Sequence, residues 1–112
     1  MSVAYWASGA VLNSYRTNSI ITLTAGELIL KMYDMALVAL AAGDGKQGTR
    51  VLAELIEALD FEHGEIALGL FRLYRYCMEE IKMGEYGVPT RILRELREAW
   101  GEALALESKK SA

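Results

Sequence analysis

The 112-residue chain contains only one cysteine, one histidine and one proline. A single cysteine cannot form an internal disulfide, which favours a reducing compartment such as the cytoplasm. One histidine and one cysteine also cannot form the ligand cluster that structural zinc requires. The scarcity of proline, together with 53% hydrophobic and 24% charged residues, excludes a disordered or collagen-like chain and predicts a globular one.

Positive charge and long apolar runs are scarce as well. Lysine and arginine number 12 against 15 acidic residues, and the net charge of −3 provides no sequence-wide positive field for nucleic acid or anionic lipid. No apolar run is long enough to cross a bilayer. The first residues lack the basic and long apolar regions of a secretory signal. We therefore expect a cytoplasmic protein with no nucleic-acid partner and no membrane insertion.

Glycine-rich breaks divide the chain after residue 24 into four segments of helical length. The breaks lie at 43–45, around Gly64 and at 84–89. Thr24 and Glu27 form a capping box that predicts a first helix starting at about Ala25, and Gly43 suits the left-handed cap that ends it. The remaining helices are expected over about 46–61, 65–83 and from about Thr90 onwards.

The apolar residues recur at three- and four-residue spacing, and no segment alternates with the period of a strand. The predicted fold is all-α, an antiparallel four-helix up-down bundle. Residues 24–112 form this single domain, and residues 1–23 form a short N-terminal segment that caps it. In the first helix the spacing places these residues in the buried seam: Leu28, Met32, Met35, Ala36, Ala39 and Leu40.

A glycine motif and the two single residues could suggest chemistry, but the sequence favours none. Gly43, Gly45 and Gly48 match the dinucleotide-binding pattern letter for letter, yet no strand precedes them to build the α/β unit that it needs. His63 cannot alone supply the two histidines of a di-metal helical site. Cys77 has apolar neighbours along its helix and is expected to be inert. We predict no catalytic residue, no metal, no cofactor and no enzymatic activity.

The most informative positive signal is a surplus of apolar residues. Leu68 and Tyr76 fall within the polar stripe of the third predicted helix, and Val38 falls within that of the first. The N-terminal segment could cover one patch while the rest remain single exposed side chains, which is ordinary for a globular protein. Equally, the surplus could form open grooves for the amphipathic helices of a partner.

Three blocks of the sequence resemble one known family. The first block comprises Tyr15, Asn18 and residues 22–28 and 30–37. The second comprises Leu59, Asp60, residues 64–67, Leu70, Leu73 and Tyr74, and the third comprises residues 96–100. Their order and spacing over about 15–104 resemble those of the flagellin-specific export chaperones, the FliS family. Ala25 stands where that family often has proline, and Met35 where it often has glycine.

The resemblance implies a helical bundle that binds the disordered C-terminal segment of flagellin in the cytoplasm. Such a chaperone prevents premature polymerisation and aids delivery to the flagellar type III export gate, without cofactor or turnover. The candidate client-binding residues are Leu59, Ile66, Leu68, Leu70, Tyr74 and Tyr76. Of these, Leu68 and Tyr76 are included only because they are apolar residues within the polar stripe of the third predicted helix. The N-terminal cap would include Tyr15, Asn18 and Ile21. Family positions with a structural role would be Thr24, Glu27, Tyr33, Asp34, Asp60 and Trp100.

A second interpretation belongs to another class of protein. The surplus apolar face could instead belong to a non-enzymatic helical adaptor with a different protein partner, or to a homodimeric structural bundle. The oligomeric state separates these cases, because a tight dimer would bury the surface that a client needs.

Overall fold

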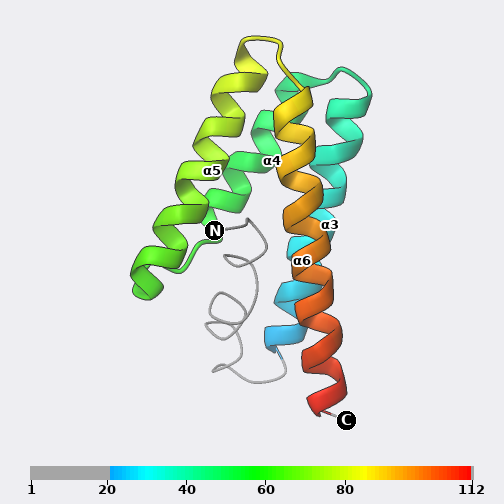
Figure 1. Ribbon diagram of the computed structural model, residues 1–112, viewed down its shortest axis with the longest axis vertical. Coiled ribbons are helices and arrows are strands. Elements are labelled where there is room, and N and C mark those ends of the chain that lie inside the picture. Colours follow the sequence, from blue (N-terminus) through cyan, green and yellow to red (C-terminus); the bar gives the residue numbers. More distant parts are fainter. Residues whose placement is uncertain (1–20, 112) are drawn as a thin grey trace.

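The computed structural model describes residues 21–111, and this part of the chain forms an all-α fold. It contains the helices α3 (Ile21–Ala41), α4 (Gly45–Glu57), α5 (Gly64–Lys82) and α6 (Gly87–Ser111), with a 3-10 turn η1 (Phe61–His63) before α5 (Figure 1). The predicted all-α fold of four helices is confirmed. Residues 1–20 lie outside the described part, as do the side chains of residues 21–24.

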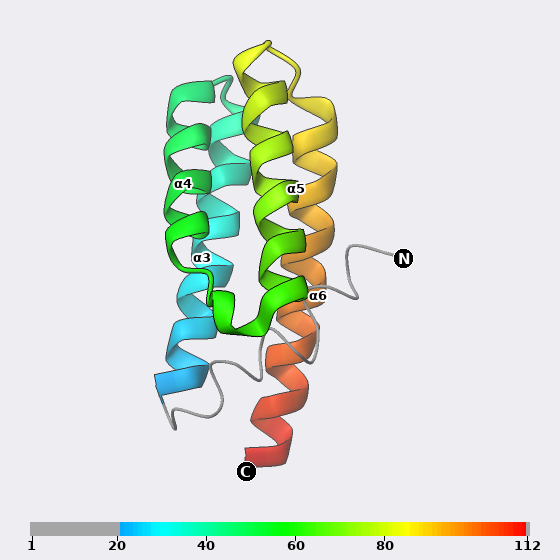
Figure 2. The same ribbon diagram turned by 90° about the vertical axis from the view of Figure 1, so that its left-hand side faces the viewer.

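Consecutive helices run in opposite directions, as the two views show (Figures 1 and 2). Helix α3 packs against α4 and α6, and α4 also packs against α5. The contact between α5 and α6 is the sparsest of the four, and Figure 1 shows the two helices diverging towards the N-terminal end of α5. Within the described range, α3 and α5 share no backbone contact. These two helices therefore lie at opposite corners of the bundle.

The turn between α3 and α4 is short because Gly43 and Asp44 together end the first helix and begin the second. Gly43 has φ of 75°, the left-handed value that favours glycine. The N–H of Asp44 donates to the Ala39 carbonyl at 2.8 Å, which closes the end of α3. The carboxylate of Asp44 then accepts from the N–H of Gln47 at 3.0 Å and begins α4. One residue thus ends one helix and caps the next.

Three predicted helix boundaries are wrong, and one of them is the start of α6, which lies at Gly87 and not near Thr90. Helix α3 begins at Ile21 and not at Ala25, so the expected boundary between residues 23 and 24 falls inside a helix. Threonine is only slightly unfavourable in a helix, and each added residue contributes a backbone hydrogen bond. Helix α4 ends at Glu57 and not near residue 61. There the carboxylate of Asp60 accepts from the N–H of Glu62 at 3.0 Å and caps η1 instead.

The core lies between all four helices and includes one large aromatic residue from α6. Trp100 is 2% exposed, and its indole N–H donates to the Gly26 carbonyl at 2.9 Å. A Cβ atom at Gly26 would lie 2.5 Å from Leu104 Cδ2, so this glycine allows α3 and α6 to approach closely. Other fully buried side chains are Leu52, Leu55, Leu70, Leu93 and Leu96.

The predicted seam of α3 is correct at Met32, Ala36, Ala39 and Leu40, which are buried or pack against the core, and wrong at two positions. Leu28 and Met35 are 58% and 48% exposed, whereas Ile29 and Tyr33 are buried. The Tyr33 hydroxyl lies 2.6 Å from that of Tyr74 on α5, within hydrogen-bonding distance. A helix that is apolar around most of its circumference has no unique inward stripe, and this contact across the core selects one.

We expect Gly43→Ala to lower the free energy of unfolding by about 1 kcal/mol, because alanine is strained at positive φ. Gly87→Ala is the matched control, since Gly87 begins α6 with open space around its Cβ position. That change should leave stability unchanged or raise it by about 0.5 kcal/mol. Urea denaturation measures both values, and an equal effect at the two sites would contradict this role of Gly43.

We expect Tyr33→Phe and Tyr74→Phe each to destabilise the fold by about 1 kcal/mol, because each breaks the buried hydrogen bond. The double variant should cost less than the sum of the two, which a double-mutant cycle by urea denaturation measures. Tyr76→Phe removes an exposed hydroxyl and serves as the control, with little change expected. Strictly additive losses would show that the two hydroxyls are not coupled.

Candidate protein-binding surface

The six candidate client-binding residues occupy three different environments. Leu70 and Tyr74 are 1% and 2% exposed and form part of the core. Leu59 and Ile66 are partly buried and pack against it. Leu68 and Tyr76 are 41% and 47% exposed. In this conformation only the last pair offers a large apolar surface to a partner.

Leu68 and Tyr76 both lie on the outside of α5. The Tyr76 hydroxyl donates to Glu80 Oε1 at 2.7 Å, one turn further along the same helix. This hydrogen bond and the charge of Glu80 raise the pKa of Tyr76. The hydroxyl is therefore satisfied within α5 while the exposed ring remains available for contact.

An aromatic pair at the start of α5 was not among the predicted site residues. Phe61 in η1 is 55% exposed, and its ring meets that of Phe71 edge to face at 6.2 Å. The guanidinium of Arg75 lies over the Phe71 ring, 6.0 Å from its centroid. An exposed phenylalanine in a short turn between helices is the sequence signal that could have identified this pair.

A second apolar surface lies along α3, the helix in which the sequence showed a surplus at Val38 but from which no site residue was predicted. Leu28, Met35 and Val38 are 58%, 48% and 69% exposed. The latter two line a shallow groove of about 430 Å³ between α3 and α4, together with Ala39 and Ala42. Sequence reasoning placed Val38 in the polar stripe but assigned Leu28 and Met35 to the core, so the three were not recognised as one exposed face.

The remaining family positions are structural where the chain is described. Tyr33 and Trp100 are buried, and Asp60 caps η1. Arg97 Nε donates to Asp34 Oδ1 at 2.7 Å, joining α6 to α3. This hydrogen bond and the charge of Asp34 raise the pKa of Arg97. Both side chains are about half exposed, so the pair contributes little stability.

Of the remaining predicted residues, only Glu27 has a described side chain. Glu27 is exposed on α3. Tyr15 and Asn18 of the expected N-terminal cap lie outside the described residues. Ile21 and Thr24 belong to α3, but their side chains are likewise outside the described part.

The dinucleotide-like glycines serve the packing of helices. The segment before Gly43 is helix α3, and the Asp44 carboxylate occupies the N-terminal end of α4, where a phosphate would bind. A Cβ atom at Gly45 would lie 2.5 Å from Tyr86 Oη, and one at Gly48 would lie 3.0 Å from Leu40 Cδ2. Glycine at these positions leaves room for the side chains of Tyr86 and Leu40.

Reactive and metal-binding groups are few in the described part of the chain. Within it, no group of three or more His, Cys, Asp or Glu residues could hold a metal ion. No helix between residues 21 and 111 is both long and apolar enough to cross a membrane. Burial, with a smaller effect from Glu80, raises the pKa of the Cys77 thiol to about 12.

We expect Cys77 to react with iodoacetamide at pH 8 more slowly than an exposed cysteine, by a factor on the order of 1,000, because so little thiolate is present. Mass spectrometry of the native protein over time measures the rate. The protein unfolded in guanidinium is the control and should react at the ordinary rate. Rapid labelling of the folded protein would contradict the inert role.

Comparisons with known proteins add no assignment to these surfaces. No family model, no curated protein and no solved structure matches the chain.

Proposed function

We propose that this protein is a non-enzymatic flagellar export chaperone, which binds the disordered C-terminal segment of flagellin in the cytoplasm. It would prevent premature polymerisation and aid delivery to the flagellar type III export gate. The observation that carries the proposal is the set of large apolar side chains outside a bundle whose core is already complete. The resemblance of residues 15–104 to the flagellin-specific chaperones supplies the identity of the client.

The exposed row on α3 has the spacing that a helical partner needs. Leu28, Met35 and Val38 extend over ten residues, or about 15 Å along the helix axis. An amphipathic helix lies in such a groove with its apolar face inward, anchored by side chains one turn apart. The groove between α3 and α4 places Met35 and Val38 beside Ala39 and Ala42, which are small enough to let a partner helix approach.

The position of the two apolar surfaces favours a long, flexible client. Helices α3 and α5 occupy opposite corners, so one short helix cannot contact both Val38 and Leu68. A disordered segment can order on both surfaces while its linking residues pass around the bundle. Part of the contact free energy is then consumed by ordering the client, which explains why the apolar surface must be extensive.

We expect Val38→Arg and Leu68→Arg each to weaken binding of the flagellin C-terminal segment about tenfold or more, because each places a charge in an apolar contact. Calorimetric titration with the purified segment measures the affinity, and circular dichroism of the mixture should show a gain in helix. Ser108→Arg introduces the same charge at an exposed position on α6 and should bind like the native protein. All three variants should keep their unfolding free energy within about 0.5 kcal/mol.

Two results would contradict the proposal. Absence of binding by the folded native protein would remove the flagellin assignment. Sedimentation that shows a tight dimer, dissociated by Val38→Arg or Leu68→Arg, would instead favour the structural bundle that buries its own apolar surface.

A further inference from the structure

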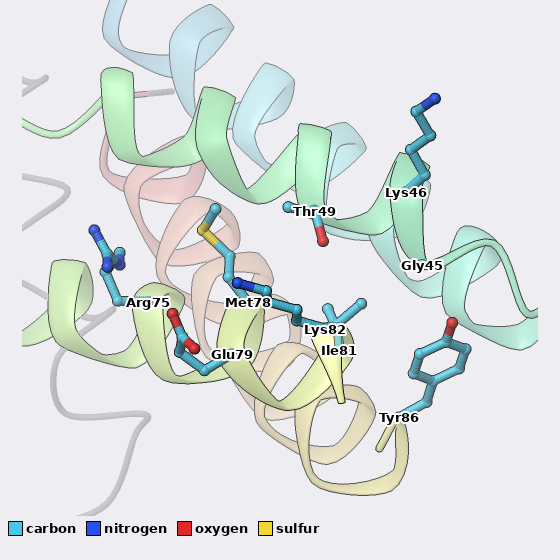
Figure 3. A pocket seen from close by; sticks show the side chains of 9 residues that line it. All are labelled: Gly45, Lys46, Thr49, Arg75, Met78, Glu79, Ile81, Lys82 and Tyr86. Atoms are coloured by element: carbon cyan, nitrogen blue, oxygen red, sulfur yellow. The ribbon is translucent and has the colours of Figure 1, made fainter. Parts of the chain in front are cut away.

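A groove between α4 and α5 differs in chemistry from the apolar surfaces. It has a volume of about 660 Å³ and extends from Arg75 to Tyr86 (Figure 3). Met78 lies between the two helices, and the Tyr86 hydroxyl points towards Gly45 at one end of the groove (Figure 3). The groove therefore has an apolar floor along its middle and a hydroxyl at one end.

Positive charge surrounds this floor. Lys46 from α4 and Arg75 and Lys82 from α5 line the groove, against the single carboxylate of Glu79. Lys82 extends along α5 in the direction of Met78, and Lys46 extends outward at the rim (Figure 3). The ion pair between described side chains joins Asp34 to Arg97, which lie outside this groove. Among the described side chains, no carboxylate lies within ion-pair distance of Lys46, Arg75 or Lys82. This local excess stands out in a chain of net charge −3.

The aromatic pair at the start of α5 holds one of these cations in place. Arg75 lies over the Phe71 ring, which in turn packs against Phe61. A guanidinium held on an aromatic face presents its donors with less loss of side-chain freedom when it binds a carboxylate. Arg75 is therefore the preorganised cation of the groove.

We propose that the α4–α5 groove binds an acidic segment of a partner protein. Carboxylates of the segment pair with Arg75 and Lys82, and an apolar side chain between them packs on Met78. A protein segment fits better than nucleic acid, because Glu79 lies among the cations and would repel a continuous row of phosphates. The site goes beyond the proposed flagellin binding, since it shares no residue with the exposed rows of α3 and α5.

The test uses a fluorescent peptide of repeated Glu-Glu-Leu triplets, titrated with the full chain at low salt and followed by anisotropy. The double variant Arg75→Glu with Lys82→Glu should raise the Kd about tenfold or more. The variant Arg91→Glu with Arg94→Glu makes the same charge change on the exposed face of α6 and should stay within about twofold of the native Kd. Binding should weaken as salt rises, and a Lys-Lys-Leu peptide should not bind.

A milder variant guards against a general loss of folding. Arg75→Gln with Lys82→Gln keeps both side chains long and polar. This variant should still weaken binding of the acidic peptide, while its circular dichroism spectrum stays native. Equal loss in the α6 control, or unchanged binding in both groove variants, would overturn the site. Stronger competition by a single-stranded oligonucleotide than by the unlabelled peptide would also overturn it, because the ligand would then carry phosphate.

Discussion

The buried hydrogen bond between the Tyr33 and Tyr74 hydroxyls sets the rotation of two helices that share no backbone contact. A hydroxyl in the core is costly without a partner, so α3 cannot turn by one residue without losing this bond. With Tyr33 inward, Leu28, Met35 and Val38 must face outward. The apolar surface available to a partner thus follows from the rotation of α3 that buries Tyr33 together with Ile29, Ala36 and Leu40.

Two glycines leave room for side chains that pack between neighbouring elements. Gly26 lets Leu104 of α6 pack against α3, and Gly45 lets the hydroxyl of Tyr86 approach the start of α4. Asp44 closes α3 through its backbone and caps α4 through its side chain. The contact of Tyr86 with Gly45 places the turn between α5 and α6 against the start of α4, at one end of the basic groove.

The molecule presents two kinds of surface that would suit different ligands. The rows on α3 and α5 are apolar and favour amphipathic helices, whereas the α4–α5 groove combines cations with an apolar floor and favours an acidic segment. Apolar contacts depend little on salt, and contacts between exposed charges weaken as salt rises. The two surfaces can therefore be separated experimentally by ionic strength as well as by mutation.

The sequence by itself determined the number of helices, the turns at Gly43, Gly64 and Gly84, and the exposure of Leu68 and Tyr76. Glycine and the 3.6-residue period act locally, so these features need no knowledge of neighbouring helices. Only the tertiary structure decided that Leu28 and Met35 face outward. A helix that is apolar on most sides has several equivalent inward faces, and only contacts with the other helices select one. The groove between α4 and α5 could not be predicted from the sequence either, because Arg75, Lys82 and Lys46 line one groove only when the two helices pack side by side.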